Sequence, residues 1–332
     1  MKFFSLFLSF FFFSSLLHAQ EEKNTDWELK QFNIYFENDL FAKTDSQYSS
    51  GEKFGLVYYI PHNDYSLYNL LIFDDGPYDS YVNFSLVNQI FTPVDISRSD
   101  LIVDDRPYAG WTFIEAGIHK SSKKSLQSLY LQLGTIGPRS QAEDIQKYIH
   151  ELTGSELPQG WDNQLKNEFG ILLRYIYKWR FEYQVTDVFE TVVVPTVEAD
   201  LGNIHIQATG GVSARFGWNI PKDFGISSIN TGGETGIAIY DEHDNTFKKP
   251  WSFSINLNLS ARAVARDIFL DGNTFQDSHS VDKKYFIAGI GAGFTARYKR
   301  IALDYNYQKQ TKQFDTEQQK HGFGSVIISV LF

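Results

Sequence analysis

The sequence contains no cysteine, so the chain forms no disulfide bonds and must be held together by its own secondary structure. Basic residues are in deficit, because 30 lysines and arginines stand against 40 aspartates and glutamates, for a formal net charge of −10. This acidity argues against nucleic acid as a partner, since phosphate backbones are bound by positive surfaces. It is compatible with divalent cations that bridge the protein to other anionic groups.

Long apolar runs are also absent, except at the N-terminus. There, Lys2 precedes about fifteen nearly unbroken apolar residues, and the run ends at Ala19 and Gln20. A positive start, a short apolar core and a small residue at the end are typical of a secretory signal peptide. We predict that residues 1–19 are removed and that the mature chain begins near Gln20. Because no second apolar run follows, a helical membrane protein is excluded.

The rest of the chain alternates apolar and polar residues, which predicts strands with one apolar face. Phe32, Ile34 and Phe36 share such a face near the start, and the last strand ends on Phe332. The 29 phenylalanines and 19 tyrosines are typical of the aromatic girdles of membrane barrels. We therefore predict an all-β fold: a transmembrane antiparallel β-barrel of about 12 strands over residues 20–332, with both chain ends in the periplasm.

One outer loop, about residues 139–165, is helical rather than strand-like. Ser140 and Glu143 fit a capping box and Gly154 fits the left-handed residue that ends a helix, which predicts a helix from about Gln141 to Thr153. Apolar residues at helical spacing predict the face that packs on the barrel: Ala142, Ile145, Ile149 and Leu152.

Two polar residues, Gln146 and His150, lie four apart on an adjoining face of this helix. That face presents a titratable imidazole beside whatever the apolar stripe packs on. A histidine in the last turn also complements the negative end of the helix dipole, so a purely structural role for His150 stays open at this point.

A second group of polar residues interrupts the first hairpin. Asn38 stands where the apolar face of the first strand should continue toward lipid, which is costly unless something covers it. Asp39 follows it, and Ser49 lies in a polar turn over residues 42–51 that leads into the next strand, within reach of both across the hairpin. We take these three residues as a candidate site.

Two further motifs carry charge. Arg106, in the segment from Asp104 to Gly110, is suited to bind a phosphate or carboxylate with two hydrogen bonds, or to brace a turn through a neighbouring aspartate. The acidic run from Asp241 to Asn245 resembles a cation-binding cluster, but its spacing fits no calcium loop and indicates a solvated turn.

Three motifs together resemble one family, the outer-membrane lipid A 3′-O-deacylases. They are the Asn38-Asp39 pair, the Tyr48-to-Gly51 segment, and the entry into the helix through Gly134, Gly137 and Pro138. The helix then continues the pattern with these residues: Gln146, His150, Gly154, Glu156, Pro158, Trp161 and Gln164. The resemblance covers residues 31–170 by motif and extends to the C-terminus by barrel pattern.

The resemblance implies a twelve-stranded outer-membrane barrel of a Gram-negative bacterium, with the short helix packed near an active site on the barrel wall. It implies calcium-dependent hydrolysis of the 3′ ester-linked acyl chains of lipid A, with lipopolysaccharide as substrate and outer-membrane lipids as surroundings. We favour a monomer. The implied catalytic residues are Asn38, Asp39, Ser49, His150 and Glu156. From the chemistry of the side chains we take Asp39 and Glu156 as candidate metal ligands, and Arg106 and Gln146 as candidate substrate-binding residues.

In the mechanism this suggests, His150 draws a proton from water, and calcium assists in stabilising the oxyanion. Three alternatives remain. Ser49 could act as a covalent nucleophile, although a short polar turn lacks the strained elbow that usually projects one. The barrel could be a channel or structural protein without activity, or it could hydrolyse glycerophospholipids instead.

Overall fold

The computed structural model describes residues 27–39, 47–60, 66–72, 77–229, 249–318 and 322–332. The predicted signal peptide and the acidic run at 241–245 lie outside these residues. The strands are β1 (Glu28–Asn38), β2 (Gln47–Ile60), β3 (Asp79–Thr92), β4 (Ala109–Ser121), β5 (Ser125–Ile136), β6 (Glu168–Trp179), β7 (Phe181–Gln184), β8 (Phe189–Gly202), β9 (His205–Trp218), β10 (Trp251–Asp267), β11 (Phe286–Tyr298), β12 (Ile301–Gln310) and β13 (Gly322–Leu331). The helices are η2 (Ser66–Leu70), η3 (Pro138–Ser140), α2 (Ala142–Thr153), η4 (Trp161–Asn163) and α3 (Ile268–Asp271).

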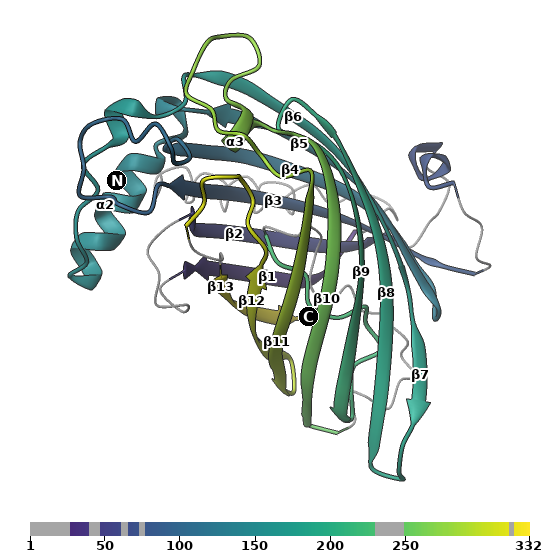
Figure 1. The fold of residues 1–332 in the computed structure, drawn as a ribbon. Coiled ribbons are helices and arrows are strands. Elements are labelled where there is room, and N and C mark those ends of the chain that lie inside the picture. Colours follow the sequence, from purple (N-terminus) through teal and green to yellow (C-terminus); the bar gives the residue numbers. More distant parts are fainter. Residues whose placement is uncertain (1–26, 40–46, 61–65, 73–76, 230–248, 319–321) are drawn as a thin grey trace.

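These strands form one closed antiparallel barrel (Figure 1). Each strand pairs with its neighbours in sequence, and β1 pairs with β13 to complete the ring. Both β6 and β7 pair with β8, so they are one barrel strand interrupted at Arg180, and the 13 labelled strands make a barrel of 12. The predicted fold class and strand number are therefore confirmed.

The outer surface of the barrel is apolar and its lumen is polar, the reverse of a water-soluble barrel. On β10, Phe253, Ile255 and Leu257 are exposed at 46%, 52% and 59%, whereas the intervening Ser254 and Asn256 are almost fully buried. Alternation of this sense suits a lipid environment, because apolar side chains meet hydrocarbon and polar ones satisfy each other inside. Among the described residues, no helix is long and apolar enough to cross a membrane.

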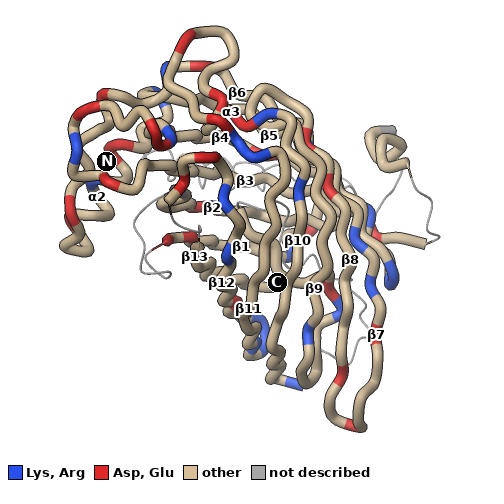
Figure 2. Tube along the Cα trace, in the orientation of Figure 1, with Lys and Arg blue, Asp and Glu red and all other residues tan. Residues whose placement is uncertain are grey.

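Buried ion pairs and a folded-in segment occupy part of the lumen. Lys53 and Glu115 pair at 2.8 Å, and Arg174 donates two hydrogen bonds to Asp200, at 2.7 and 2.8 Å. The chain after β9 enters the lumen, where Phe224 and Ile220 pack against inward-facing apolar residues of four strands: Val57, Tyr81, Leu126, Val192 and Val194. Acidic positions recur around α2 and α3 at one end of the barrel (Figure 2).

Candidate active site on the outer wall

The first four strands place a row of residues side by side near one end of the barrel. Asn38 pairs with Ser50, and Ile90 pairs with both Ser50 and Gly110. Paired residues in an antiparallel sheet point to the same face. Since Phe32, Ile34 and Phe36 on β1 face outward in phase with Asn38, this whole row lies on the outer surface of the wall.

Asn38 breaks the apolar face at this row, as the sequence predicted. Its side chain points outward, yet the residue is only 6% exposed. A buried amide on the lipid side of a barrel requires a polar cover.

Ser49 sits beside this row at an irregularity in the ladder. The pairing of β2 with β3 shifts register between Tyr48 and Ser50, which marks Ser49 as the extra residue of a β-bulge. Its Oγ lies 2.5 Å from Oγ1 of Thr92, and both side chains are buried. The predicted turn is therefore wrong over residues 47–51, which belong to β2; the bulge brings the Ser49 hydroxyl to Thr92.

Helix α2 is seated on the outer wall through a glycine. A Cβ on Gly110 would lie 2.1 Å from Cβ of Ala142 and 2.3 Å from Oγ of Ser140. Thr112, two residues along β4, donates a 2.7 Å hydrogen bond to the carbonyl oxygen of Ser140. The helix entry is thus fixed to β4, and Figure 1 shows α2 beside the ends of the neighbouring strands.

The bounds of α2 confirm the predicted helix, but its N-terminal cap differs. Gln141 takes the cap position with φ of 60°, and no side-chain cap bond forms there. Glu143 pairs instead with Lys147, so the predicted capping box is wrong. At the other end Gly154 has φ of 70° and donates to the carbonyl of His150, as predicted.

The predicted apolar stripe of α2 is confirmed only in part, because Ala142 is buried and Ile145 packs against the same hydrophobic cluster, but the stripe does not extend to Leu152. Ala142, Gln146 and His150, spaced four apart, are its buried residues, while Leu152 is 69% exposed. The two polar residues of this face are covered by the segment that follows the helix, through Trp161 and the carbonyl of Glu156.

His150 is held by the loop that follows its own helix. Its Nδ1 makes a short contact with the carbonyl oxygen of Glu156. A carbonyl only accepts, so Nδ1 carries the proton and Nε2 holds the lone pair of the neutral ring. Nε2 makes no hydrogen bond with any residue that the structure describes, which leaves it in the form of a general base.

Gln146 is fixed by the segment that folds back over α2. Trp161 Nε1 donates a 2.9 Å hydrogen bond to Gln146 Oε1, and Trp161 itself is buried against Tyr108. Two backbone bonds tie this segment to the loop between β3 and β4, from Leu165 N to the Tyr108 oxygen at 2.9 Å and from Gln159 N to the Ile96 oxygen at 2.8 Å. The amide Nε2 of Gln146 is buried without a hydrogen-bond partner in the described structure.

The oxygen groups at this site suit a hard cation in part. Asn38, Asp39 and Ser49 are buried and offer amide, carboxylate and hydroxyl oxygens, the donor types that calcium takes. Glu156 has an exposed side chain, and its carbonyl is engaged with His150. No cluster of three His, Cys, Asp or Glu side chains able to hold a metal occurs within the described ranges. A calcium site here would therefore draw on amide and hydroxyl oxygens.

Arg106 lies apart from these residues, at the lumen. Its guanidinium donates to Gln313 Oε1 at 3.0 Å, stacks over Phe91 at 5.3 Å, and is 1% exposed. The aspartate beside it, Asp105, braces the loop by accepting from Val94 N and Arg106 N, both at 2.8 Å. Arg106 therefore lies on the lumen side of the wall, whereas Asn38 lies on its outer side, and the interpretation of Asp105 as a brace for this loop agrees with the structure.

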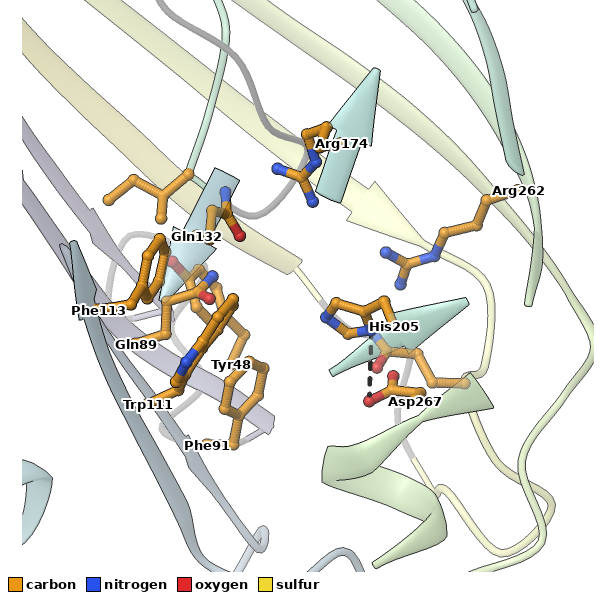
Figure 3. Close-up of a pocket in the computed structure, with 12 residues that line it drawn as sticks. Tyr48, Gln89, Phe91, Trp111, Phe113, Gln132, Arg174, His205, Arg262 and Asp267 are labelled. Carbon is orange, nitrogen blue, oxygen red and sulfur yellow. Dashed lines mark ion pairs between the residues drawn. The ribbon is translucent and has the colours of Figure 1, made fainter. Parts of the chain in front are cut away.

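Sequence reasoning missed a polar pocket in the lumen. Figure 3 shows His205, Asp267 and Arg262 facing Tyr48 and Trp111 across it. Its free space of about 30 Å³ has room for about two water molecules, and His205 Nδ1 lies 3.8 Å from Asp267 Oδ1. The alternation of apolar and polar residues along each strand indicates that these side chains face the lumen, but it does not predict which of them lie close together.

Comparisons with known proteins agree with this architecture. A family model described as "Outer membrane protein LpxR" matches residues 6–332. The solved structure of LpxR from Salmonella typhimurium superposes with a TM-score of 0.71 at 18% identity, covering 91% of this chain and 100% of that one.

More distant solved barrels also match. The β domain of the Bordetella autotransporter BrkA gives a TM-score of 0.42 at 8% identity and covers 93% of this chain and 100% of that one. The NalP translocator domain of Neisseria meningitidis gives 0.40 at 8% identity, covering 96% and 92%. No curated protein sequence matches. Because the family model spans nearly all of the chain, the protein belongs to the LpxR family of outer membrane proteins.

Proposed function

We propose that the protein is an outer-membrane hydrolase of Gram-negative bacteria that removes the ester-linked 3′ acyl chains of lipid A. Family membership and the outer-wall site support this proposal together. The observation that carries it is His150, a buried imidazole whose tautomer is set by its own loop and whose Nε2 bonds to none of the residues that the structure describes. A site between helix and outer wall opens to the leaflet in which lipid A lies.

The proposed chemistry is attack by water on the ester carbonyl carbon. His150 Nε2 accepts a proton from water as the C–O bond forms, and the amide of Asn38 donates to the developing oxyanion. When the tetrahedral intermediate collapses, the sugar oxygen leaves and takes the proton back from His150, releasing a free fatty acid. Ser49, hydrogen-bonded to Thr92, orients the water or the ester.

Calcium, when bound, would polarise the ester carbonyl as a Lewis acid. Asp39, with the oxygens of Asn38 and Ser49, would hold it, and Glu156 remains a proposed additional ligand. Gln146 would position the acyl group at its ester through Nε2, which has no hydrogen-bond partner among the described residues.

The test is mass spectrometry of lipid A from cells that express wild type or His150→Ala at equal membrane levels with calcium present. Loss of the 3′ acyl mass with wild type alone is the expected result. His279→Ala is a matched control, because His279 also bonds a loop carbonyl, that of Asp105 at 2.8 Å, but lies outside α2. Phospholipid hydrolysis without lipid A hydrolysis, or equal activity in His150→Ala, would refute the proposal.

A further inference from the structure

A second set of buried oxygens lies on the outer wall, one row deeper than Asn38. We propose that Glu52, Asn88 and Ser50 form a divalent-cation site in this wall. The inference concerns binding and does not depend on the proposed hydrolysis.

The strand register brings the three residues together. Glu52 on β2 is directly opposite Asn88 on β3, so their Cβ atoms are about 4.5–5.5 Å apart. Ser50 lies two residues before Glu52 on the same face of β2, about 7 Å along the strand. All three point outward, because Glu52 pairs with the outward-facing Phe36 and Ser50 with Asn38.

The hydrogen bonds of Asn88 fix which way its amide points. Asn88 Nδ2 donates to Thr112 Oγ1 at 2.6 Å, and the single hydroxyl proton of Thr112 goes to the Ser140 carbonyl. The opposite amide orientation would set two acceptors against each other at Thr112. Asn88 therefore turns its Nδ2 toward β4 and its Oδ1 away from Thr112, on the side of β2 and Glu52.

These oxygens are buried and without partners within the described structure. Both carboxylate oxygens of Glu52, Oδ1 of Asn88 and Oγ of Ser50 are out of solvent and form no hydrogen bond. Asn88 is 0% exposed and Ser50 is 3% exposed. The Ser50 hydroxyl lies close to the Glu52 carboxylate without the geometry of a hydrogen bond.

A buried carboxylate facing lipid is expensive unless a positive group compensates it. No basic side chain pairs with Glu52 in the part of the chain that the structure describes. A divalent cation satisfies all four oxygens at once, and carboxylate, amide and hydroxyl oxygens are the ligands that calcium and magnesium prefer. The acidic chain and the acidic residues around α2 favour cations at this end of the barrel.

The experiment measures thermal unfolding of the full exported chain in detergent micelles, first with EDTA and then with added calcium. The variants are Glu52→Gln, which keeps shape and removes charge, and Glu52→Leu, which matches the apolar rows around it. Asp304→Asn is the matched control, a buried carboxylate on the lumen side that accepts from Thr295 at 2.5 Å.

We expect a crossover. In EDTA both Glu52 variants unfold at a higher temperature than wild type, because an uncompensated charge is gone. With calcium the wild-type midpoint rises, and both variants lose at least about half of that rise. The control keeps the full calcium response.

An equal calcium-induced rise of the thermal midpoint in wild type and both Glu52 variants would overturn the cation site. The burial of Glu52 would then be explained by a protonated carboxyl group. Activity is not read in this experiment, so failure of the proposed hydrolysis would show only in the lipid A assay, and failure of the cation site only here.

Discussion

Replacing Gly110 with alanine is expected to unseat helix α2 while leaving the barrel closed. The new Cβ would lie 2.1 Å from Cβ of Ala142 and 2.3 Å from Oγ of Ser140, far inside van der Waals contact. Overpacking of this kind costs about 1–3 kcal/mol. If the whole cost destabilises the packed position of the helix, the equilibrium constant between the packed and the detached helix falls roughly 5- to 150-fold, at tenfold per 1.4 kcal/mol.

The assay compares lipid A deacylation with barrel integrity, read as heat-modifiable migration on a denaturing gel. Gly210→Ala is the matched control, because a Cβ at this strand glycine of β9 meets nothing within 4 Å. Adding Ala142→Gly to the Gly110→Ala variant removes one of the two clashing partners and should restore part of the activity. Full activity in Gly110→Ala, or equal losses in both glycine variants, would refute the reasoning.

Three other predictions concern the surroundings of the site. Trp161→Phe removes the donor to Gln146 Oε1 and should destabilise the packed position of helix α2 by about 1–3 kcal/mol, which is measured as faster proteolysis of the 139–165 loop. Trp161→His keeps a ring N–H, so its loop should be cleaved less rapidly than that of Trp161→Phe. Gly154→Ala places a side chain at φ of 70°, costs about 1 kcal/mol, and should loosen the turn that holds His150; unchanged loop proteolysis would contradict this. Burial raises the pKa of Glu317 in the loop before β13, so the contribution of this carboxyl to stability is present below pH 4.5 and is lost as the pH rises through the raised pKa. Glu317→Gln should therefore stabilise the barrel relative to wild type, and the difference should grow with pH. A pH-independent difference in thermal midpoint would contradict this prediction.

The barrel could be predicted from the sequence because a lipid-facing strand must alternate at every second residue. Phe253, Ile255 and Leu257 obey that rule without exception, and so does most of the ring. The interruption at Arg180 left no signal in the alternation, since β6 and β7 continue along the same partner strand.

The helix could be predicted in extent but not in orientation. Its end depends on Gly154, a local feature that the sequence displays. Its packing face depends on what lies against it: Gln146 and His150 are buried under the segment that follows the helix, through Trp161 and the Glu156 carbonyl, whereas Leu152 is exposed. The contacts that the helix makes in the folded protein, and not the spacing of its apolar residues alone, determine which of its faces is buried.

The candidate site could likewise be predicted from the sequence only in part. Asn38 was recognisable because it breaks a lipid-facing stripe. Thr92 and Thr112 carried no such mark, since their roles arise only from the bulge at Ser49 and the entry of α2. Arg106 resembled a phosphate ligand in sequence, but the loop directs it to Gln313, more than two hundred residues away, which spacing along the chain cannot reveal.

The segment inside the lumen has a consequence for the cell that carries this protein. Where the structure describes the interior, the segment around Phe224 is anchored there by side chains of the wall, including Lys178 on Ser227 at 2.8 Å and Arg180 on the Asp223 carbonyl at 3.0 Å. A solute that crossed on the side of this segment would have to break those bonds, and one that crossed beside β2 and β4 would meet the Lys53–Glu115 pair. We therefore expect the antibiotic sensitivity of cells that produce this barrel to stay near that of cells without it.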